Sequence, residues 1–341
     1  MSEQSDGVKF LRVQKRKRMK PKIKLAIPDH PRTKALIDGK VEIEGYDLEI
    51  THHFAGRAGE RHHRFVEGEF DVSEFSAATY LRTKEQGFRF SAMPIFFERG
   101  PRQRNIFCCE GRITNPSELK NKRVGCQHYG ATAVVWARGF LLDEYGLKTT
   151  DMEWFAFGRE IHLGVELPVK VARPDPLPAW GEDREPLAKL VSEGTLDAAI
   201  VAGDMGHLGI FGGGILPGVM GKFPGVKPLF ANTDEIIHWI RQKQIYPIMH
   251  LIALKDEIVE RDRDLPAKLL VAFREAKKLS VEYMSPELIA SLEKEKEILR
   301  EDPYVYELGK IEQRTLETLM RYQIEQGLMR KQLPVQSLFC P

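Results

Sequence analysis

Short apolar segments alternate with helical segments along most of this 341-residue chain, and this alternation limits the fold more than any other feature. Residues 123–126 illustrate it: an apolar strand leads into a polar turn, then into a helical run at 133–145 that ends at Gly146. Such alternation predicts an α/β protein with mostly parallel sheets, right-handed crossovers and helices on both faces. A return strand at 245–254 and a helical tail complete the pattern.

The alternation falls into two blocks, so we expect two lobes that face each other across a cleft. Residues 23–107 and 230–341, with the helical tail, are assigned to the first lobe, and residues 108–229 to the second. Residues 1–22 hold eight Lys or Arg against two acidic residues, and we expect them to be a basic flexible extension. The remaining chain carries a net charge of −4, which excludes a general polyanion binder. We therefore expect neither nucleic acid nor a membrane as a partner.

The composition is that of a globular protein, with 42% hydrophobic residues. No run approaches the roughly 18 apolar residues of a membrane-spanning helix. The basic N-terminus has no apolar segment behind it, so it does not resemble a secretory signal. We expect a cytoplasmic protein, which argues against a periplasmic receptor. The four cysteines show no metal-binding spacing and are expected to be reduced thiols.

The turn at residues 124–132 is the first candidate for ligand binding. A helix that begins just after a strand directs unpaired N–H groups and partial positive charge beyond the strand end, where a carboxylate can bind. His128, Tyr129 and Thr132 add donors and acceptors there. The alternative is an ordinary strand-to-helix turn with no ligand.

Polar residues follow three other predicted strands at the same end. Asp29 and Arg32 follow the first strand, Glu74 and Ser76 follow the strand at 70–72, and Asp204 follows the strand at 195–201. Ligands of α/β proteins bind at the carboxyl ends of strands, so two facing lobes would bring these side chains together. A helix cap explains Ser76 equally well, but it leaves unexplained Glu74, which stands between the apolar positions Val72 and Phe75.

Two other segments invite a cofactor but do not support one. The histidine pairs at 52–53 and 62–63 lack the H-E-x-x-H pattern, and adjacent histidines on a helix point about 100° apart, so a polar helix face is the better interpretation. The glycine-rich stretch at 209–218 fits neither of the two common nucleotide-binding glycine motifs. We expect no cofactor and no metal.

Several short motifs resemble those of the 4,5-dihydroxyphthalate decarboxylase family. The resemblance covers residues 23 to about 280 and is carried by Asp29-x-x-Arg-Thr33, Gly45-Tyr-Asp-Leu48, Phe70-Asp-Val-Ser-Glu74 with Tyr80-Leu81, Leu119-Lys-Asn-Lys-Arg-Val-Gly125, Ala133-x-x-Trp-x-Arg-Gly139 with Asp143-Glu-Tyr-Gly146, and Tyr246-Pro-Ile-Met-His250. It implies a two-lobed, type 2 periplasmic-binding-protein-like fold put to enzymatic use. It also implies decarboxylation of 4,5-dihydroxyphthalate to protocatechuate and CO2, a step of phthalate degradation.

That reaction would need no electron-sink cofactor, because a ring hydroxyl para to the carboxylate makes the ring its own sink. We expect His250 to protonate the ring carbon, since a histidine can titrate near neutral pH. Glu74 would orient His250 or act as the base at the phenol. Arg32 and Arg104 would clamp carboxylates. Further binding residues are expected to be Ser76, His128, Tyr129, Thr132 and Asp204.

Three hypotheses remain open. The first is the cofactor-free aromatic-acid decarboxylase, and the second is a solute-binding protein that holds an aromatic carboxylate in the same cleft without turnover. The third is a metal-dependent lyase in which Asp29, Glu74 and His250 hold a divalent ion. A core histidine bonded to a carbonyl is the alternative for His250, and a surface or capping role is the alternative for Arg32. Self-association also remains open.

Overall fold

The computed structural model describes residues 20–340 except 55–56, 180–181, 183 and 203–221. Its strands form two separate sheets. The first has the order β2-β1-β3-β11-β4, with bounds β1 Lys22–Ala26, β2 Asp47–Thr51, β3 Val72–Ser76, β4 Phe90–Arg99 and β11 Ile248–Lys255. The second has the order β10-β5-β9-β6-β7-β8, with bounds β5 Ile106–Cys109, β6 Arg123–Cys126, β7 Glu153–Ala156, β8 Val171–Ala172, β9 Ala198–Ile200 and β10 Val226–Pro228.

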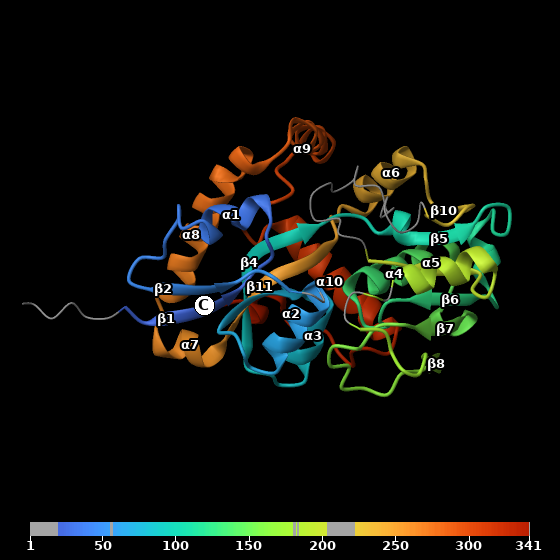
Figure 1. The fold of residues 1–341 in the computed structure, drawn as a ribbon, viewed down its shortest axis with the longest axis horizontal. Helices are drawn as coiled ribbons and strands as arrows, with labels where there is room; N and C mark the ends of the chain where they lie inside the picture. The colour runs from blue at the N-terminus through green and yellow to red at the C-terminus, as the bar shows by residue number, and fades with distance from the viewer. Residues whose placement is uncertain (1–19, 55–56, 180–181, 183, 203–221, 341) are drawn as a thin grey trace, which may run out of the picture.

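Helices cover the sheets and complete two lobes, so the expected α/β class is confirmed (Figure 1). The helices of the described residues are α1 Pro31–Ile37, α2 Arg57–Val66, α3 Ala77–Glu85, α4 Thr132–Tyr145, α5 Arg184–Glu193, α6 Thr233–Lys243, α7 Asp256–Arg261, α8 Leu265–Lys278, α9 Pro286–Leu299 and α10 Lys310–Glu325. No helix among them combines the length and apolar character needed to cross a membrane.

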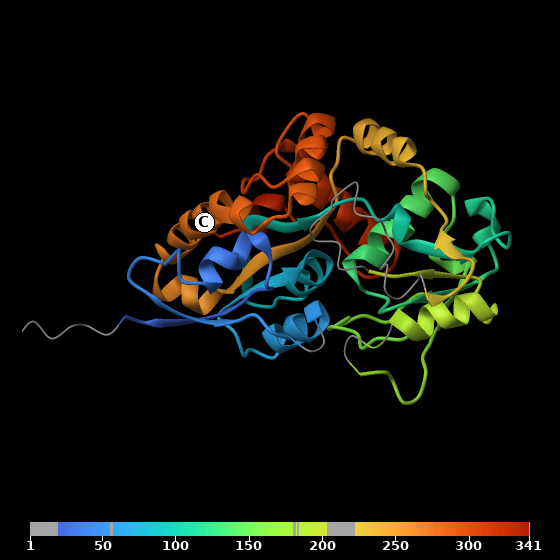
Figure 2. The ribbon, with the colours of Figure 1, turned by 45° about the horizontal axis from the view of Figure 1, so that its top comes forward.

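The chain passes between the lobes twice, from β4 to β5 and back through α6 to β11 (Figure 2). These passages make the sheets mixed, because β11, β5 and β10 run against their neighbours while the other strand pairs are parallel. The domain boundary expected after residue 107 falls inside β5, which belongs entirely to the second sheet. The chain therefore leaves the first sheet a few residues earlier than expected, at Arg99.

The strand β11 is inserted between β3 and β4, although β3 and β4 are close in sequence. Every residue of β3 is buried. Val72 packs into the hydrophobic cluster on one face of the sheet, and Phe75 packs into the cluster on the other face. β11 is also buried along most of its length. Polar residues on these two strands are therefore held rigidly inside the first lobe.

The C-terminal helix α10 contacts both lobes. A Cβ added at Gly139 of α4 would lie 2.1 Å from the ring of Tyr322, so the glycine allows α10 to pack directly on the second lobe. Arg82 of α3 donates to Gln323 on the same helix at 3.0 Å and also to the Gly130 carbonyl at 2.9 Å. The helical tail thus helps to fix the two lobes against each other.

Candidate active site

The carboxylate of Glu74 on β3 is the centre of a buried polar cluster. Its side chain is 1% exposed, and its Oε2 atom accepts hydrogen bonds from two nitrogens of Arg61, of which Nε lies at 2.8 Å. The Nε2 atom of His62 lies 3.1 Å from the same oxygen. Both partners come from α2, which lies beside β3. Three nitrogens therefore converge on one carboxylate oxygen, which satisfies a charge that would otherwise be costly to bury.

His250 on β11 contacts the other oxygen of Glu74. Its Nδ1 atom forms an ion pair with Glu74 Oε1 and lies 3.2 Å from Oε2 of Glu98, near the end of β4. Glu98 in turn accepts a bond from Arg102 at 2.6 Å. The result is a row of alternating charge, Arg61–Glu74–His250–Glu98–Arg102, that runs across three strands and their flanking segments.

The charges of this row set the protonation states of its members. Burial works to lower the pKa of His250, but Glu74 and Glu98 outweigh it, so the pKa lies above the usual 6.5. Burial likewise works to raise the pKa of Glu74, yet Arg61 and His250 hold it well below the usual 4.5. Burial lowers the pKa of His62 to about 3. The surroundings therefore favour the protonated form of His250 and the neutral form of His62.

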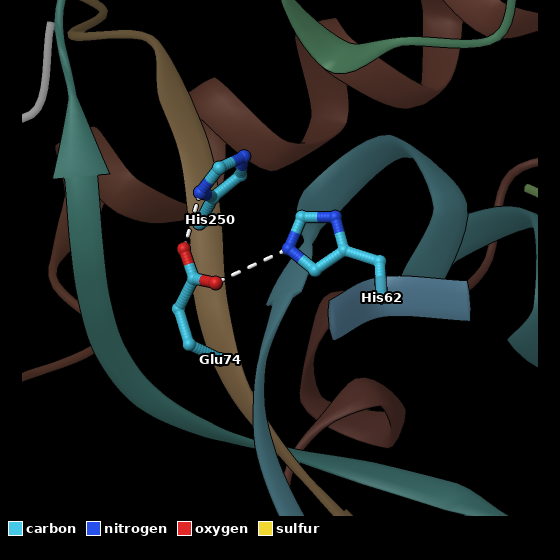
Figure 3. Close-up of side chains that lie close together, drawn as sticks. All are labelled: His62, Glu74 and His250. Carbon is cyan, nitrogen blue, oxygen red and sulfur yellow. Dashed lines mark hydrogen bonds and ion pairs between the residues drawn. The ribbon is translucent and has the colours of Figure 1, made fainter. Parts of the chain in front are cut away.

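The second ring nitrogen of His250 is turned away from these partners. Figure 3 shows Nε2 pointing away from Glu74, while the dashed contact runs to Nδ1. The side chain is 16% exposed, in contrast to the fully enclosed Glu74. A histidine held at Nδ1 by carboxylates, with Nε2 directed elsewhere, is arranged to donate a proton from Nε2.

The two lobes meet next to this histidine. Ser76 lies opposite His250 in the β3–β11 pairing, so both side chains are on the same face of the sheet. The hydroxyl oxygens of Ser76 and Thr132 are 2.8 Å apart, and Thr132 also accepts a bond from the Ala78 N–H at 3.0 Å. Ser76 caps α3 and Thr132 is the first residue of α4. Two helix N-termini, one from each lobe, therefore converge beside His250, where they favour negative charge.

The structure thus brings together Glu74, Ser76, Thr132 and His250, four of the residues predicted from sequence. Glu74, Ser76 and His250 lie on one face of the first sheet, and Thr132 is the first residue of α4. Asp204 lies outside the described residues.

Part of the predicted anion site, in the turn between β6 and α4, is filled from within the chain. The carboxylate of Glu160 accepts the N–H of Tyr129 at 2.6 Å and that of Gly130 at 3.0 Å. The Nδ1 atom of His128 is 3.9 Å from the same carboxylate. Tyr129 is a core residue and not a ligand residue, because its ring is fully buried beneath the Arg138 guanidinium.

The two arginines expected to clamp carboxylates have contacts within the chain. Arg32 is 2% exposed, donates to the Phe97 carbonyl at 2.7 Å and lies 3.7 Å over the ring of Tyr304. It also borders a cavity of about 230 Å³ beside α8 and α9. Arg104 donates to the Thr233 hydroxyl and to the Ala231 carbonyl at the start of α6. Carbonyls, a hydroxyl and an aromatic ring of the chain therefore contact these guanidinium groups, and their role as carboxylate clamps stays a prediction.

Sequence reasoning missed Arg61, His62, Glu98 and Arg102. The segment around residues 60–64 was expected to be a polar helix face, but Arg61 and His62 are 4% and 2% exposed and point into the first lobe. Glu98 and Arg102 pair across four residues. That Glu-x-x-x-Arg spacing was the available signal, although it is also common on exposed helices.

The cluster also satisfies part of a metal-binding pattern. Ligand atoms of His62, Glu74 and His250 lie within 4.8 Å of one another, whereas Asp29, the third ligand expected from sequence, pairs with Lys34. The donor types suit a divalent transition metal. However, Arg61 donates two N–H groups to the Glu74 oxygen that faces His62. Arg61 therefore engages Oε2 of Glu74 and His250 contacts Oε1, so an ion bound there would compete with one of these contacts.

Comparison with known proteins gives two curated relatives. The chain is 28% identical over 279 residues to the 4,5-dihydroxyphthalate decarboxylase of Comamonas testosteroni, covering 78% of each protein. It is 30% identical over 184 residues to the protein of the same name from Pseudomonas putida, covering 52% of this chain and 69% of that one. No protein-family model matches the chain.

Solved structures confirm the expected type 2 periplasmic-binding-protein fold. The periplasmic aliphatic sulphonate binding protein SsuA of Escherichia coli aligns with a TM-score of 0.55 at 14% identity, covering 93% of this chain and 91% of that one. A ligand-binding component of an import system from Staphylococcus aureus aligns at 0.52 with 12% identity, covering 94% and 96%. The desulfurization enzyme DSZB aligns at 0.50 with 12% identity, again covering 94% and 96%. The fold is therefore shared by binding proteins and by an enzyme.

Proposed function

The chain belongs to the 4,5-dihydroxyphthalate decarboxylase family, and on that basis we propose that it is a carboxy-lyase acting on a hydroxylated aromatic dicarboxylic acid. The proposed reaction converts 4,5-dihydroxyphthalate to protocatechuate and CO2. The observation that carries the proposal is the placement of the His250 ring, whose Nδ1 atom contacts Glu74 and Glu98 beside the meeting point of the two lobes.

His250 is the proton donor in this proposal. One ring hydroxyl is para to the carboxylate that leaves, and it raises the electron density at the ring carbon that bears this carboxylate. Nε2 of His250 transfers its proton to that ring carbon. The bond to the carboxyl group then breaks, its electron pair returns to the ring, and CO2 leaves. Each turnover takes up one proton, which water restores to Nε2 after the product departs. Acid catalysis of this kind contributes a factor of about 10²–10⁴.

Glu74 acts as an orienting group and not as the base at the phenol. It is enclosed, and donors occupy both of its oxygens. With its charge held, Glu74 keeps the Nδ1 proton of His250 in place. The ring hydroxyl needs no full deprotonation in this scheme, since the proton added to the ring carbon allows CO2 to leave without a free aryl carbanion.

The substrate carboxylates are proposed to bind where α3 and α4 begin. The two helix N-termini supply partial positive charge, and Ser76 and Thr132 supply hydroxyl groups at the same place. His128 lies four residues before Thr132, on the second lobe's side of this junction. This arrangement takes over the role first expected of Arg32 and Arg104.

The direct test incubates the purified full-length protein with 4,5-dihydroxyphthalate and measures protocatechuate and CO2 over time. Stoichiometric appearance of both supports the decarboxylase. Tight binding of the acid without turnover would contradict it and favour the solute-binding alternative, for which the fold is equally suitable.

A metal-dependent lyase is the second candidate, and the grouping of His62, Glu74 and His250 is the observation that favours it. The two mechanisms use the same histidine differently. In the first, Nδ1 carries a proton between two carboxylates; in the second, that proton is replaced by an ion. The bonds from Arg61 to Glu74 favour the proton.

A further inference from the structure

His250 lies at the most irregular point of the first sheet. Along β11, Ile252 pairs with Met93 and Ile248 pairs with Arg99, but His250 pairs with Glu98, and the register shifts on both sides of it. Between Met93 and Glu98 the strand β4 carries extra residues, including Pro94, which cannot donate a ladder hydrogen bond. Such bulges redirect side chains next to active sites. Here the irregularity brings the Glu98 carboxylate to the imidazole.

Glu98 is itself fixed by a buried arginine. Arg102 is 3% exposed and donates to Glu98 at 2.6 Å, while its other terminal nitrogen lies 3.4 Å from the carbonyls of Gly100 and Pro101. The turn after β4 thus folds the guanidinium back onto the carboxylate. Glu98 accepts Arg102 with Oε1 and faces His250 with Oε2, so each oxygen has a separate partner.

We propose that Glu98, held by Arg102, is a positioning residue that acts beside Glu74 on the protonated ring of His250 and thereby sets the highest pH at which His250 can act as the acid. This proposal rests on the proposed function, and it deepens the account of the same site. Glu98 does not touch the reacting atoms; it acts through His250.

Of the charged groups around His250, Glu98 can be replaced with the least disturbance to the rest of the cluster. Glu74 from β3 also binds Arg61 and His62 of α2, so its removal would leave two buried groups without their partner. His62 contacts the ring of His250 edge-on at 4.8 Å and is neutral, and Arg61 is a cation that disfavours the imidazolium. Glu98 is the remaining charged group from β4, and at 16% exposure it can be replaced with less disturbance.

The sign of the effect follows from the charges. Two carboxylates at Nδ1 stabilise the imidazolium, and they raise the pKa of His250. Loss of one of them lowers that pKa, so the acid loses its proton at a lower pH. The alkaline limit of activity must then move to lower pH, while activity at a pH low enough to protonate the histidine in both proteins is nearly unchanged.

The test compares wild type with Glu98→Gln, which keeps the shape of the side chain and still accepts from Arg102. Two quantities are measured: the pH dependence of kcat/KM, and the titration of His250 followed by NMR of the substrate-free protein. We expect both to shift to lower pH by about one unit, because one opposite charge at this distance has an effect of that size. KM at pH 6 should change less than twofold.

Two further variants complete the design. Glu98→Asp retains the charge at a greater distance and should give an intermediate shift, which also keeps the test valid if Glu98→Gln folds poorly. Glu110→Gln removes an exposed carboxylate paired with Lys227 in the second lobe and should leave both profiles unchanged.

The outcomes separate this proposal from the proposed function. If Glu98→Gln leaves the NMR titration of His250 at its wild-type position, the positioning role is wrong, whatever the activity. If the titration shifts but the wild type does not decarboxylate 4,5-dihydroxyphthalate, the positioning role stands and the proposed function fails.

Discussion

The hydroxyl oxygens of Ser76 and Thr132 lie 2.8 Å apart and join the first turns of two helices that belong to different lobes. Neither residue is exposed, and the Ala78 N–H donates to the same Thr132 oxygen. This contact fixes the distance between the helix N-termini at the proposed carboxylate site.

Replacement of Thr132 by Val removes these bonds with little change in volume. We expect about 1–3 kcal/mol less stability, because a buried N–H and a buried hydroxyl lose their partner, together with a higher KM for the dianionic substrate. Thermal unfolding and steady-state kinetics measure the two effects. Thr318→Val is the control, since its hydroxyl bonds only to a carbonyl within α10. An unchanged KM would remove Thr132 from the binding site.

Replacement of His250 by Ala should lower kcat by a factor of about 10²–10⁴ and largely spare substrate binding. The physical reason is that only the proton donor is lost. Kinetics and equilibrium dialysis with the substrate measure the two quantities, and His238→Ala, on the exposed face of α6, serves as the control. A near-native rate in the His250 variant would show that another group supplies the proton.

The buried neutral His62 predicts a loss of stability in acid. Its folded-state pKa of about 3 is below the unfolded value near 6.5, so the unfolded chain binds more protons between these limits. This group's contribution is present above pH 6.5 and is lost as the pH falls toward 3. Between pH 6.5 and 4, the free energy of unfolding of His62→Gln should fall by up to about 3 kcal/mol less than that of wild type. Urea unfolding at a series of pH values measures this difference. Parallel pH profiles for both proteins would contradict the assignment.

Metal removal should leave the activity intact. Arg61 and His250 already engage the two oxygens of Glu74, so dialysis against a strong chelator is expected to change kcat by less than twofold. Elemental analysis of the purified protein gives an independent readout. A stoichiometric ion whose removal abolishes turnover, and whose return restores it, would establish the metal-dependent lyase instead.

Arg32→Ala distinguishes a clamp from a packing residue. Because Arg32 is buried against Tyr304 and bonded to a carbonyl, we expect the variant to lose about 3 kcal/mol of stability, as buried network deletions do. Binding of dianionic acids and of neutral catechols should then weaken by the same factor. A selective loss of dianion binding, measured by competition, would restore the carboxylate-clamp role.

Sequence pattern alone was enough for the class of fold and for grouping Ser76 and Thr132 with Glu74, although Glu74 lies within β3 and not in a turn after it. His250 was expected only through the family resemblance. Strand ends can be recognised from alternation, and parallel strands share one ligand edge. The direction of a long side chain cannot be recognised in this way. Arg32 stands at a strand end as expected, yet it turns against β4 because a carbonyl and an aromatic ring are available there.

The remaining site residues depend on contacts that local pattern does not contain. Glu160 lies about 30 residues beyond the turn whose N–H groups it binds. His62 resembles an exposed helix residue until β3 places a carboxylate beneath it. Glu98 reaches His250 only because the β4–β11 register shifts at that point.

β11 lies between β3 and β4 in the sheet, but it is synthesised long after both of them. About 150 residues separate the end of β4 from the start of β11. At a typical synthesis rate, the facing edges of β3 and β4 therefore wait roughly 8 to 30 seconds for their partner. During translation these edges are open to pairing with other nascent chains. The last strand also carries His250, the proposed proton donor, so a truncated translation product that ends before residue 248 lacks that residue.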